Sequence, residues 1–308
     1  MILKMEKSVF IVILNWNGWE DTAKCVESCR ELTYVNFHIL VVDNGSTDGS
    51  ETNLRKKFSD IDIIQTGRNL GFSGGNNVGI RRALEQDADF VWLLNNDTIV
   101  DPACLARMVQ AMEAGDHVGM VGSKIYYHDS PDTLWFAGGE VDLEGGGLTR
   151  HIGKDEIDRG DYDTQKETAY LTGCSILARR EMIDEIGLLE ENYFLYFEDA
   201  DWSLRAKQKG WKLMYQPEAI LWHKEGAQTG KIHSEGFVYY FLRNRFFFIR
   251  RFAPKKMLSC HFLQIKTALF FIKEAFLRGG FGWRTLQLVV AAYMDFFIKN
   301  RMGCNHKI

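Results

Sequence analysis

A chain of 308 residues can hold one large domain or two. With 46% hydrophobic and 25% charged residues, its composition is that of a soluble globular protein and excludes a disordered or fibrous chain. No uncharged apolar run reaches the ~18 residues that a membrane-spanning helix needs, and the first residues contain no stretch apolar enough for a signal peptide.

The net charge of −4 conceals an uneven distribution along the chain. Residues 231–308 carry 14 Lys and Arg against 3 Asp and Glu, whereas the preceding 230 residues carry 23 against 38. The chain is therefore an acidic body with a basic, aromatic tail. Because the acidic body would repel a polyanion, we expect no nucleic-acid partner.

The six cysteines predict free thiols in a reducing compartment. They show neither the density of a disulfide framework nor a paired metal-ligand spacing. Free thiols are typical of the cytosol. We therefore expect a cytoplasmic protein, either free or peripheral on the inner face of the cytoplasmic membrane.

The first hundred residues alternate between strands and helices. Short apolar runs bounded by polar residues are typical of strands buried on both faces of a sheet. We expect strands at residues 9–14, 37–42, 61–65 and 90–94, with helices at residues 19–32, 50–58 and 76–87. This alternation predicts an α/β fold with a mostly parallel central sheet and right-handed crossovers.

The remaining elements are less regular. We expect helices at residues 102–115, 180–186 and 198–209, strands at residues 118–127, 168–178, 212–215 and 219–222, and irregular loops or a small hairpin over residues 128–168. Beyond residue 230 the pattern becomes helical to the end. The boundaries that follow are an α/β domain over residues 1–230 and a C-terminal helical region over residues 231–308.

Two aspartates follow apolar strands directly. Asp43 comes after the second strand and Asp97 after the fourth, and ligands of open α/β sheets bind at the carboxyl ends of such strands. Asp and Asn also favour turns, so either residue alone could be a turn former or helix cap. Together they indicate a site, in which one carboxylate could accept the imide N–H of uracil or thymine and the other could hold a metal bound to a diphosphate.

Residues 68–79 are rich in Gly and Asn. The stretch matches neither the dinucleotide-binding fingerprint nor the P-loop. We expect a Gly-rich loop before the helix at residue 76, where backbone amides could approach a phosphate or ribose. Alternatively, the glycines serve tight turns.

Three acids cluster at the start of a predicted helix. Glu198, Asp199 and Asp201 suit the positive end of that helix, and Asp201 could pair with Arg205 one turn later. However, they also follow an aromatic run, residues 193–197, that suggests a half-buried wall. Because burial and clustering raise carboxylate pKa values towards those of a general base, we assign that role to Asp199.

His223 follows an apolar strand and precedes Lys224. A lone histidine is more often structural than functional. In the context of the acids above, it could complete a metal site or contact a phosphate.

With these residues in hand, the chain resembles the family 2 glycosyltransferases, and within them a rhamnosyltransferase-like branch. The resemblance covers about residues 8–225 and rests on six stretches, residues 13–17, 41–48, 69–79, 93–98, 173–180 and 197–205. It extends to residues 239–244 of the tail. It implies a GT-A fold, with a nucleotide-binding half over about residues 1–100 and an acceptor-binding half over about residues 101–230.

The resemblance also implies an inverting transfer from a nucleotide-diphosphate sugar, with a role for each matching residue. Asp43 would bind the nucleobase, Asp199 would be the catalytic base, and Asp97 with His223 would hold Mg²⁺ or Mn²⁺. The other implied donor-binding residues are Asn15, Asn17, Arg68, Asn69, Gly74, Asn77, Asn95 and Asn96. The implied acceptor-binding residues are Gly173, Glu198, Asp201 and Trp202.

One position departs from the family pattern. Asn95 stands where the Asp-x-Asp motif of the family begins, so Asp97 has no second acid in its triplet. Mg²⁺ keeps several waters and binds substrate phosphates, so one carboxylate can suffice. Metal affinity could nevertheless be low.

The basic tail allows two interpretations. Its aromatic residues fall near one helical face with Arg243, Arg245, Arg250 and Arg251 around them, and Lys255, Lys256, Lys266 and Lys273 continue the charge. Such a helix suits an anionic membrane surface, where a polyprenol-linked acceptor would lie. Alternatively, the tail packs on the catalytic domain or on a second subunit of a homodimer.

The leading hypothesis is a glycosyltransferase of cell-surface polysaccharide synthesis, with dTDP-rhamnose as its donor and a saccharide or lipid-linked saccharide as its acceptor. A sugar-phosphate nucleotidyltransferase also joins an α/β sheet to a metal-held diphosphate, but needs no base near residue 199. A catalytically silent nucleotide-sugar-binding scaffold is the third hypothesis.

Overall fold

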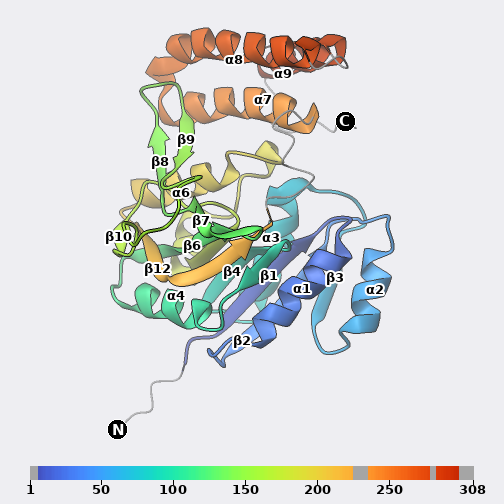
Figure 1. The fold of residues 1–308 in the computed structure, drawn as a ribbon, viewed down its shortest axis with the longest axis vertical. Coiled ribbons are helices and arrows are strands. Elements are labelled where there is room, and N and C mark those ends of the chain that lie inside the picture. The colour runs from blue at the N-terminus through green and yellow to red at the C-terminus, as the bar shows by residue number, and fades with distance from the viewer. Residues whose placement is uncertain (1–5, 225–234, 278–281, 298–308) are drawn as a thin grey trace.

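A central mixed sheet forms the core of the computed structural model, which describes residues 6–224, 235–277 and 282–297 (Figure 1). The strand order is β10-β12-β6-β11-β4-β1-β2-β3, with β5 paired to β12 and β7 paired to β6. The strands of this sheet are β1 (Val9–Asn15), β2 (Phe37–Asp43), β3 (Asp62–Gln65), β4 (Phe90–Asn95), β5 (Thr98–Val100), β6 (Val118–Tyr127), β7 (Ser130–Phe136), β10 (Lys166–Glu167), β11 (Ser175–Arg179) and β12 (Lys212–His223).

Helices pack around this sheet and build a separate layer at the C-terminal end (Figure 1). Those of the α/β domain are α1 (Trp19–Arg30), α2 (Ser50–Lys57), α3 (Gly71–Glu85), α4 (Cys104–Glu113), α5 (Arg180–Ile186) and α6 (Glu198–Gln208). The C-terminal layer contains α7 (Glu235–Phe252), α8 (Met257–Leu277) and α9 (Gly282–Phe297), and short 3-10 turns lie at Glu191–Tyr193 and Pro254–Lys256.

The half of the sheet nearest the N-terminus is parallel, as the apolar runs predict. β1 pairs in parallel with β2 and with β4, and β2 pairs in parallel with β3. The apolar side chains of β1 and β4 are almost all buried, because α-helical crossovers leave neither face of a parallel sheet in water. The predicted fold class and the four N-terminal strands are thus confirmed.

The second half of the α/β domain departs from the predicted elements in three places. The strand expected over residues 168–178 is shorter, since only β11 forms there, and it runs antiparallel to β4 and β6. The two strands expected at residues 212–215 and 219–222 are one strand, β12, with an irregularity between Gln216 and Ile220. The region expected to hold irregular loops or a small hairpin does contain a hairpin, of β8 (Gly139–Asp142) and β9 (Leu148–His151), but it also contains the strand β7, which was not expected.

The prediction of a Gly-rich loop before residue 76 is wrong. Helix α3 begins at Gly71, five residues earlier than expected, so most of the glycines lie inside its first turns. A Cβ atom at Gly75 would collide with Leu14, and one at Gly79 would collide with Val12. These glycines allow α3 to lie close against β1, a packing role that a glycine count cannot distinguish from a phosphate loop.

The C-terminal helices pack onto the α/β domain through α7, which lies between that domain and α8–α9 (Figure 1). Arg243 and Arg245, which the membrane interpretation would place near lipid, are both 1% exposed. Arg245 donates to the carbonyl of Gly146 at 2.6 Å, at the tip of the β8–β9 hairpin. Packing on the catalytic domain is therefore the correct interpretation for α7. The boundary expected at residue 230 lies outside the described residues.

Within the described helices, none is long and apolar enough to cross a membrane.

Candidate active site

Three parallel strands end side by side at the carboxyl edge of the sheet. β1 lies between β2 and β4, with Asn15 opposite Asp43 and Leu14 opposite Asn95. Because strand register is set along the whole length of each apolar run, the polar residues that follow these runs meet at one edge. The structure thus brings the predicted residues of all three strands together, where ligands of such sheets bind.

Asp43 is fully buried at the end of β2. Its Oδ1 accepts a hydrogen bond from Ser46 N at 3.0 Å, whereas its Oδ2 has no hydrogen-bond partner within the described part of the chain. A buried carboxylate oxygen without a donor is costly, and natural sites rarely keep one without a reason. This oxygen is therefore suited to accept an N–H group from a ligand.

Asn15 and Asn17 brace the loop after β1. Asn15 Oδ1 accepts from Thr22 Oγ1 at 2.7 Å, and its Nδ2 donates to Ser46 Oγ at 3.1 Å. Asn17 N donates to the same Ser46 oxygen at 2.9 Å, and Asn17 has a left-handed φ of 52° that asparagine tolerates. Ser46, which links both residues to the loop carrying Asp43, was not singled out from the sequence.

Asn95 and Asn96 tie the end of β4 to its neighbours. Asn95 N donates to Cys174 O at 2.9 Å. Asn96 Nδ2 donates to Thr22 Oγ1 at 2.9 Å, so it fixes the strand end to α1. Both residues are half-buried, and they hold the backbone from which Asp97 projects.

Asp97 and His223 meet because β5 pairs with β12. In that antiparallel register His223 lies opposite Thr98, one residue after Asp97. His223 Nε2 is 3.2 Å from Asp97 Oδ1, yet Asp97 Oδ1 and His223 Nδ1 are both buried atoms without a hydrogen bond in the described structure. A carboxylate oxygen and an imidazole nitrogen facing one another fit a divalent cation.

The cation would take few ligands from this chain. No group of three or more His, Cys, Asp or Glu side chains with metal-binding geometry occurs among the described residues. A metal held by Asp97 and His223 would complete its shell with phosphate and water oxygens, which Mg²⁺ accepts readily.

Asp199 reaches the same edge from α6. Its Oδ2 accepts from Gly173 N at 2.9 Å and its Oδ1 from Ala200 N at 2.7 Å. Gly173 precedes Cys174, whose carbonyl binds Asn95 N, so one short segment joins the predicted base to the end of β4. Burial raises the pKa of Asp199, and these backbone hydrogen bonds oppose the rise.

Glu198 lies beside Asp199 and is 4% exposed. Its Oε2 lacks a hydrogen-bond partner among the residues the structure describes. Burial, followed by the neighbouring carboxylate of Asp199, raises the pKa of Glu198 well above its usual range. Because the two carboxylates are adjacent and buried, ionising both is disfavoured.

Comparison with known proteins assigns the chain to a family. Residues 8–187, more than half of the chain, match the family model described as glycosyl transferase family 2. The chain belongs to glycosyl transferase family 2. It is therefore a glycosyltransferase, as the resemblance implied.

Curated relatives place the glycosyltransferase near rhamnosyltransferases. It is 26% identical over 212 residues to the N-acetylglucosaminyl-diphospho-decaprenol L-rhamnosyltransferase of Mycobacterium tuberculosis, covering 63% of this chain and 68% of that protein. It is 23% identical over 269 residues to the dTDP-rhamnosyl transferase RfbF of Shigella flexneri, covering 83% of this chain and 84% of that one.

Solved structures confirm the GT-A fold. GalNAc-T7 with UDP, GalNAc and Mn²⁺ superposes with a TM-score of 0.60 at 17% identity, covering 77% of this chain and 48% of that one. The mannosyltransferase PcManGT from Pyrobaculum calidifontis, in complex with GDP-Man and Mn²⁺, gives a TM-score of 0.56 at 14% identity, covering 96% and 82%.

Two residues expected to bind the acceptor are instead enclosed in the glycosyltransferase. Asp201 is 0% exposed and is held by Arg205 Nε at 2.6 Å, Arg251 Nη1 at 2.9 Å and Tyr193 Oη at 3.2 Å. Trp202 is also 0% exposed, and its Nε1 donates to Gly187 O at 2.9 Å. Their burial and saturated hydrogen bonds give both residues a structural role.

Two residues expected to bind the donor are enclosed in the same way. Asn77 is 1% exposed and clamps Leu189, accepting from its N at 3.0 Å and donating to its O at 2.9 Å. Gly74 lies inside α3, where an added Cβ would come within 2.9 Å of Leu70. Neither residue faces the sheet edge as a ligand contact, because the segment is a helix and not a loop.

Arg68 and Asn69 lie on the exposed connection between β3 and α3. Asn69 Oδ1 accepts from Gly71 N at 2.8 Å and from Asn44 Nδ2 at 3.1 Å. This places the connection directly beside the loop after Asp43. Arg68 is thus exposed at the donor side of the site, where it remains a candidate phosphate or ribose contact.

An aromatic wall next to His223 was not found from the sequence. The Trp135 ring lies 4.6 Å from that of His223 and 4.4 Å from that of His151, centroid to centroid. Burial lowers the pKa of His151 to about 4, so this ring is neutral beside the proposed cation site. Trp135 and His151 of this wall come from β7 and β9. They lie in the region expected to hold irregular loops or a small hairpin, where no sequence motif indicated a site.

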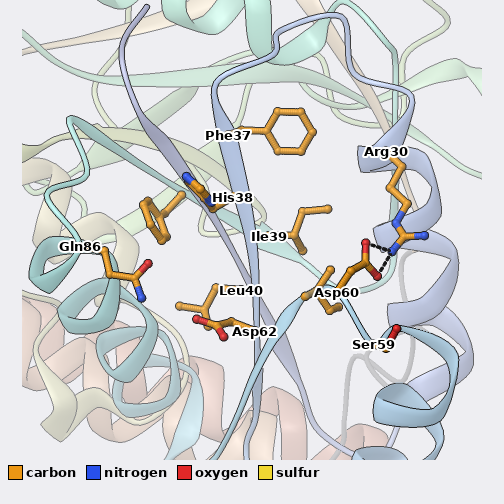
Figure 2. Close-up of a pocket in the computed structure, with 11 residues that line it drawn as sticks. Arg30, Phe37, His38, Ile39, Leu40, Ser59, Asp60, Asp62 and Gln86 are labelled. Carbon is orange, nitrogen blue, oxygen red and sulfur yellow. Dashed lines mark hydrogen bonds and ion pairs between the residues drawn. The ribbon is translucent and has the colours of Figure 1, made fainter.

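A surface hollow at the other end of the sheet is unrelated to this site. Figure 2 shows it at the amino end of β2, lined by Phe37, His38 and their neighbours. Its charged groups satisfy each other, since Arg30 binds both carboxylate oxygens of Asp60 at 2.5 and 2.8 Å. Ligands of open α/β sheets bind at the opposite, carboxyl end.

Proposed function

We propose that the glycosyltransferase moves rhamnose from dTDP-rhamnose to a saccharide or lipid-linked saccharide, with inversion at the anomeric carbon. One observation supports this most strongly. Two buried carboxylate oxygens without hydrogen-bond partners among the described residues, Asp43 Oδ2 and Asp97 Oδ1, face the same sheet edge to which Asp199 is hydrogen-bonded. A donor with an imide N–H at one end and a charged diphosphate at the other would satisfy both atoms.

The nucleotide would bind from β2 to β5. Asp43 Oδ2 would accept the imide N–H of thymine, and Arg68 would approach the ribose or phosphates. The preference for thymidine and rhamnose rests on the relatives, one of which is a dTDP-rhamnosyl transferase.

Asp97 and His223 would hold the divalent cation. Mn²⁺ or Mg²⁺ supplies positive charge that stabilises the departing nucleoside diphosphate. The facing oxygen and nitrogen, 3.2 Å apart, are the ligand types such an ion takes in proteins. Both solved structures compared above contain Mn²⁺ with a nucleotide or nucleotide sugar.

Asp199 would act on the acceptor. Its carboxylate takes the proton of the acceptor hydroxyl as the hydroxyl oxygen forms a bond to the anomeric carbon. The bond from that carbon to the diphosphate oxygen breaks on the opposite face, and its electron pair leaves with the nucleoside diphosphate. The hydrogen bond from Gly173 N orients the carboxylate, and its raised pKa makes it a stronger base than an exposed aspartate.

A lipid-linked acceptor requires access to a membrane, and the outer side of α8 and α9 offers a surface for it. All but four of the exposed large hydrophobic side chains in the described residues lie on these two helices. Phe262 and Leu269, 60% exposed each, share one face of α8 with the exposed Lys266 and Lys273. Apolar and basic residues together suit an anionic lipid surface.

The donor is tested by calorimetric titration with dTDP-rhamnose, UDP-galactose, UDP-N-acetylglucosamine and GDP-mannose, each with and without Mn²⁺. We expect the tightest binding for dTDP-rhamnose with Mn²⁺, and transfer with inverted anomeric configuration by NMR. Tighter binding of another donor would overturn the rhamnosyl assignment. Pyrophosphate release from a sugar phosphate and a nucleotide would instead indicate a nucleotidyltransferase, and binding without turnover a silent scaffold.

The membrane surface is tested by co-sedimentation with phosphatidylglycerol vesicles. We expect wild-type binding that weakens with salt and is lost in the double variant Phe262→Ser and Leu269→Ser. A stable dimer by light scattering, without vesicle binding, would show that a second copy covers this face.

A further inference from the structure

The loop immediately before Asp199 has an unusual backbone. Phe194, Tyr196 and Phe197 have φ angles of 65°, 70° and 76°, which makes them half of the described non-glycine residues with positive φ. Such a conformation is unfavourable for a non-glycine residue and persists only where its surroundings enforce it. Holding the loop before Glu198 and Asp199 in this conformation therefore lowers the stability of the fold.

Asn244 of α7 holds this loop through its main-chain carbonyls. Its side-chain Nδ2 lies 2.9 Å from Tyr193 O, 2.8 Å from Leu195 O and 2.9 Å from Tyr196 O. Asn244 is 0% exposed, so water does not compete for these three oxygens. Without that amide, Leu195 O and Tyr196 O would lose this donor in a poorly hydrated interior, which is costly.

Arg243 holds the same loop from the adjacent position, and the side chains of Arg243 and Asn244 together are called the clamp below. Its Nη2 donates to Asn192 O at 2.8 Å and to Tyr193 O at 3.0 Å. Its Nε donates to Asn244 Oδ1 at 2.9 Å, which orients the amide so that Nδ2 faces the loop. The guanidinium itself lies over the rings of Tyr239 and Tyr240.

The opposite side of the loop contacts α3. Phe72 N donates to Phe194 O at 2.6 Å, and an added Cβ at Gly71 would collide with Phe194. The loop is thus fixed between the start of α3 and α7, and its conformation depends on both.

We propose that Arg243 and Asn244 are positioning residues for Asp199. They lie outside the family-matched residues 8–187 and are buried against the loop. By fixing the left-handed loop, they hold the start of α6 so that Asp199 Oδ2 stays on Gly173 N. The C-terminal helices are then part of the catalytic apparatus through this contact. The catalytic part of this inference rests on the proposed role of Asp199 as base.

The clamp is tested first without reference to activity, by amide hydrogen exchange of Asn244→Ala in the full-length protein. The matched control is Gln264→Ala, which removes a buried amide on α8 that donates to Leu242 O at 2.7 Å and leaves the loop contacts intact. We expect exchange over residues 192–199 to accelerate at least ~10-fold in Asn244→Ala only. Equal exchange in both variants would overturn the clamp.

Kinetics test the positioning role. In Asn244→Ala we expect kcat for transfer to fall about 100-fold, because a small displacement of a catalytic group costs that much, with an unchanged KM for the donor. Asn244→Asp, which replaces the Nδ2 donor by a second acceptor oxygen facing these carbonyls, should be more severe, and Gln264→Ala should retain wild-type kcat. If Asn244→Ala retains kcat although its loop exchanges faster, the positioning role is wrong.

A milder substitution tests the same role in case Asn244→Ala does not fold. Arg243→Lys keeps the charge but cannot make the same planar pair of contacts, and we expect about a 10-fold loss of kcat. Wild-type kcat in Arg243→Lys would contradict the role of Arg243. The two proposals fail separately, since full turnover of Asp199→Asn would refute the base assignment and leave the exchange result standing.

Discussion

Buried carboxylates occur in two neighbouring regions of the glycosyltransferase, and their partners differ. At the sheet edge, Asp43, Asp97 and Glu198 each keep an oxygen without a hydrogen bond in the described structure. At the interface of α6 and α7, Asp201 is saturated by Arg205, Arg251 and Tyr193. Because burying an unpaired polar group is costly, the first region is built for a ligand and the second for the fold.

The largest effect on turnover should come from Asp199. Replacing it with Asn keeps the shape and removes the base, so kcat should fall by about 10²–10⁴. Donor affinity by calorimetry should stay at the wild-type value, because the proposed role of Asp199 is to contact the acceptor and not the nucleotide. If transfer of the sugar continues at the wild-type rate, another residue is the base.

The pH dependence of kcat should follow the carboxylates at the start of α6. Burial raises the pKa of Asp199, and the base acts only when deprotonated. The rate should therefore fall about tenfold per pH unit on the acid side, from a higher pH than an exposed aspartate would give. An acid limb at or below the ordinary aspartate pKa would contradict this.

Glu198→Gln should change the stability and leave this limb in place. Burial and then the charge of Asp199 raise the pKa of Glu198, whereas the pKa of Asp199 is set by burial and backbone hydrogen bonds, so the substitution should not move it. Since the pKa of Glu198 is raised in the folded state, ionising it at neutral pH opposes folding. The variant should have a higher Tm than wild type at pH 8 and no such gain at pH 4, which scanning calorimetry measures.

Asp43 should have a smaller effect, confined to the donor. Asp43→Asn replaces a charged acceptor, and a hydrogen bond to a charged group is worth about 1.5–3 kcal/mol, so the donor KM should rise roughly 10- to 100-fold. We expect kcat at saturating donor to change little. A donor KM equal to that of wild type would show that Asp43 does not bind the base.

Asp201 should have the smallest effect on turnover and a large one on stability. Asp201→Asn leaves the largely buried Arg205 without its counter-charge, whereas Arg251 is 39% exposed and keeps Glu190 at 3.6 Å, so the cost should be below the ~3–5 kcal/mol of a fully buried pair. We expect a lower Tm with kcat close to wild type in the folded fraction. A selective rise in acceptor KM would restore Asp201 to the acceptor site.

The strands of the parallel half and the acids that follow them were predictable from sequence, because a buried strand requires a continuous apolar run. The role of the glycines of α3 was not predictable. Close packing against Val12 and Leu14 requires the absence of a side chain, and so does phosphate binding. Asp201 and Asp199 likewise share one helix start. Arg205, one turn later, already favoured Asp201 as the paired acid, but the second partner, Arg251, lies 50 residues later and is known only from the structure.

The arginines of α7 show the same limit of prediction from sequence. Arg243 and Arg245 have the composition of a membrane-facing helix, but their side chains bind carbonyls of the catalytic domain. Charge and periodicity do not indicate whether a buried carbonyl lies within reach.

The contrast between unpaired and paired carboxylates is tested most directly by one calorimetric comparison. dTDP with Mn²⁺ is titrated into Asp97→Asn and into Asp201→Asn, the same substitution at two acids of neighbouring regions. We predict that Asp97→Asn loses the Mn²⁺-dependent part of the affinity and that Asp201→Asn keeps it. Equal affinity in both variants, or an affinity in wild type that does not respond to Mn²⁺, would contradict a donor site built on Asp97.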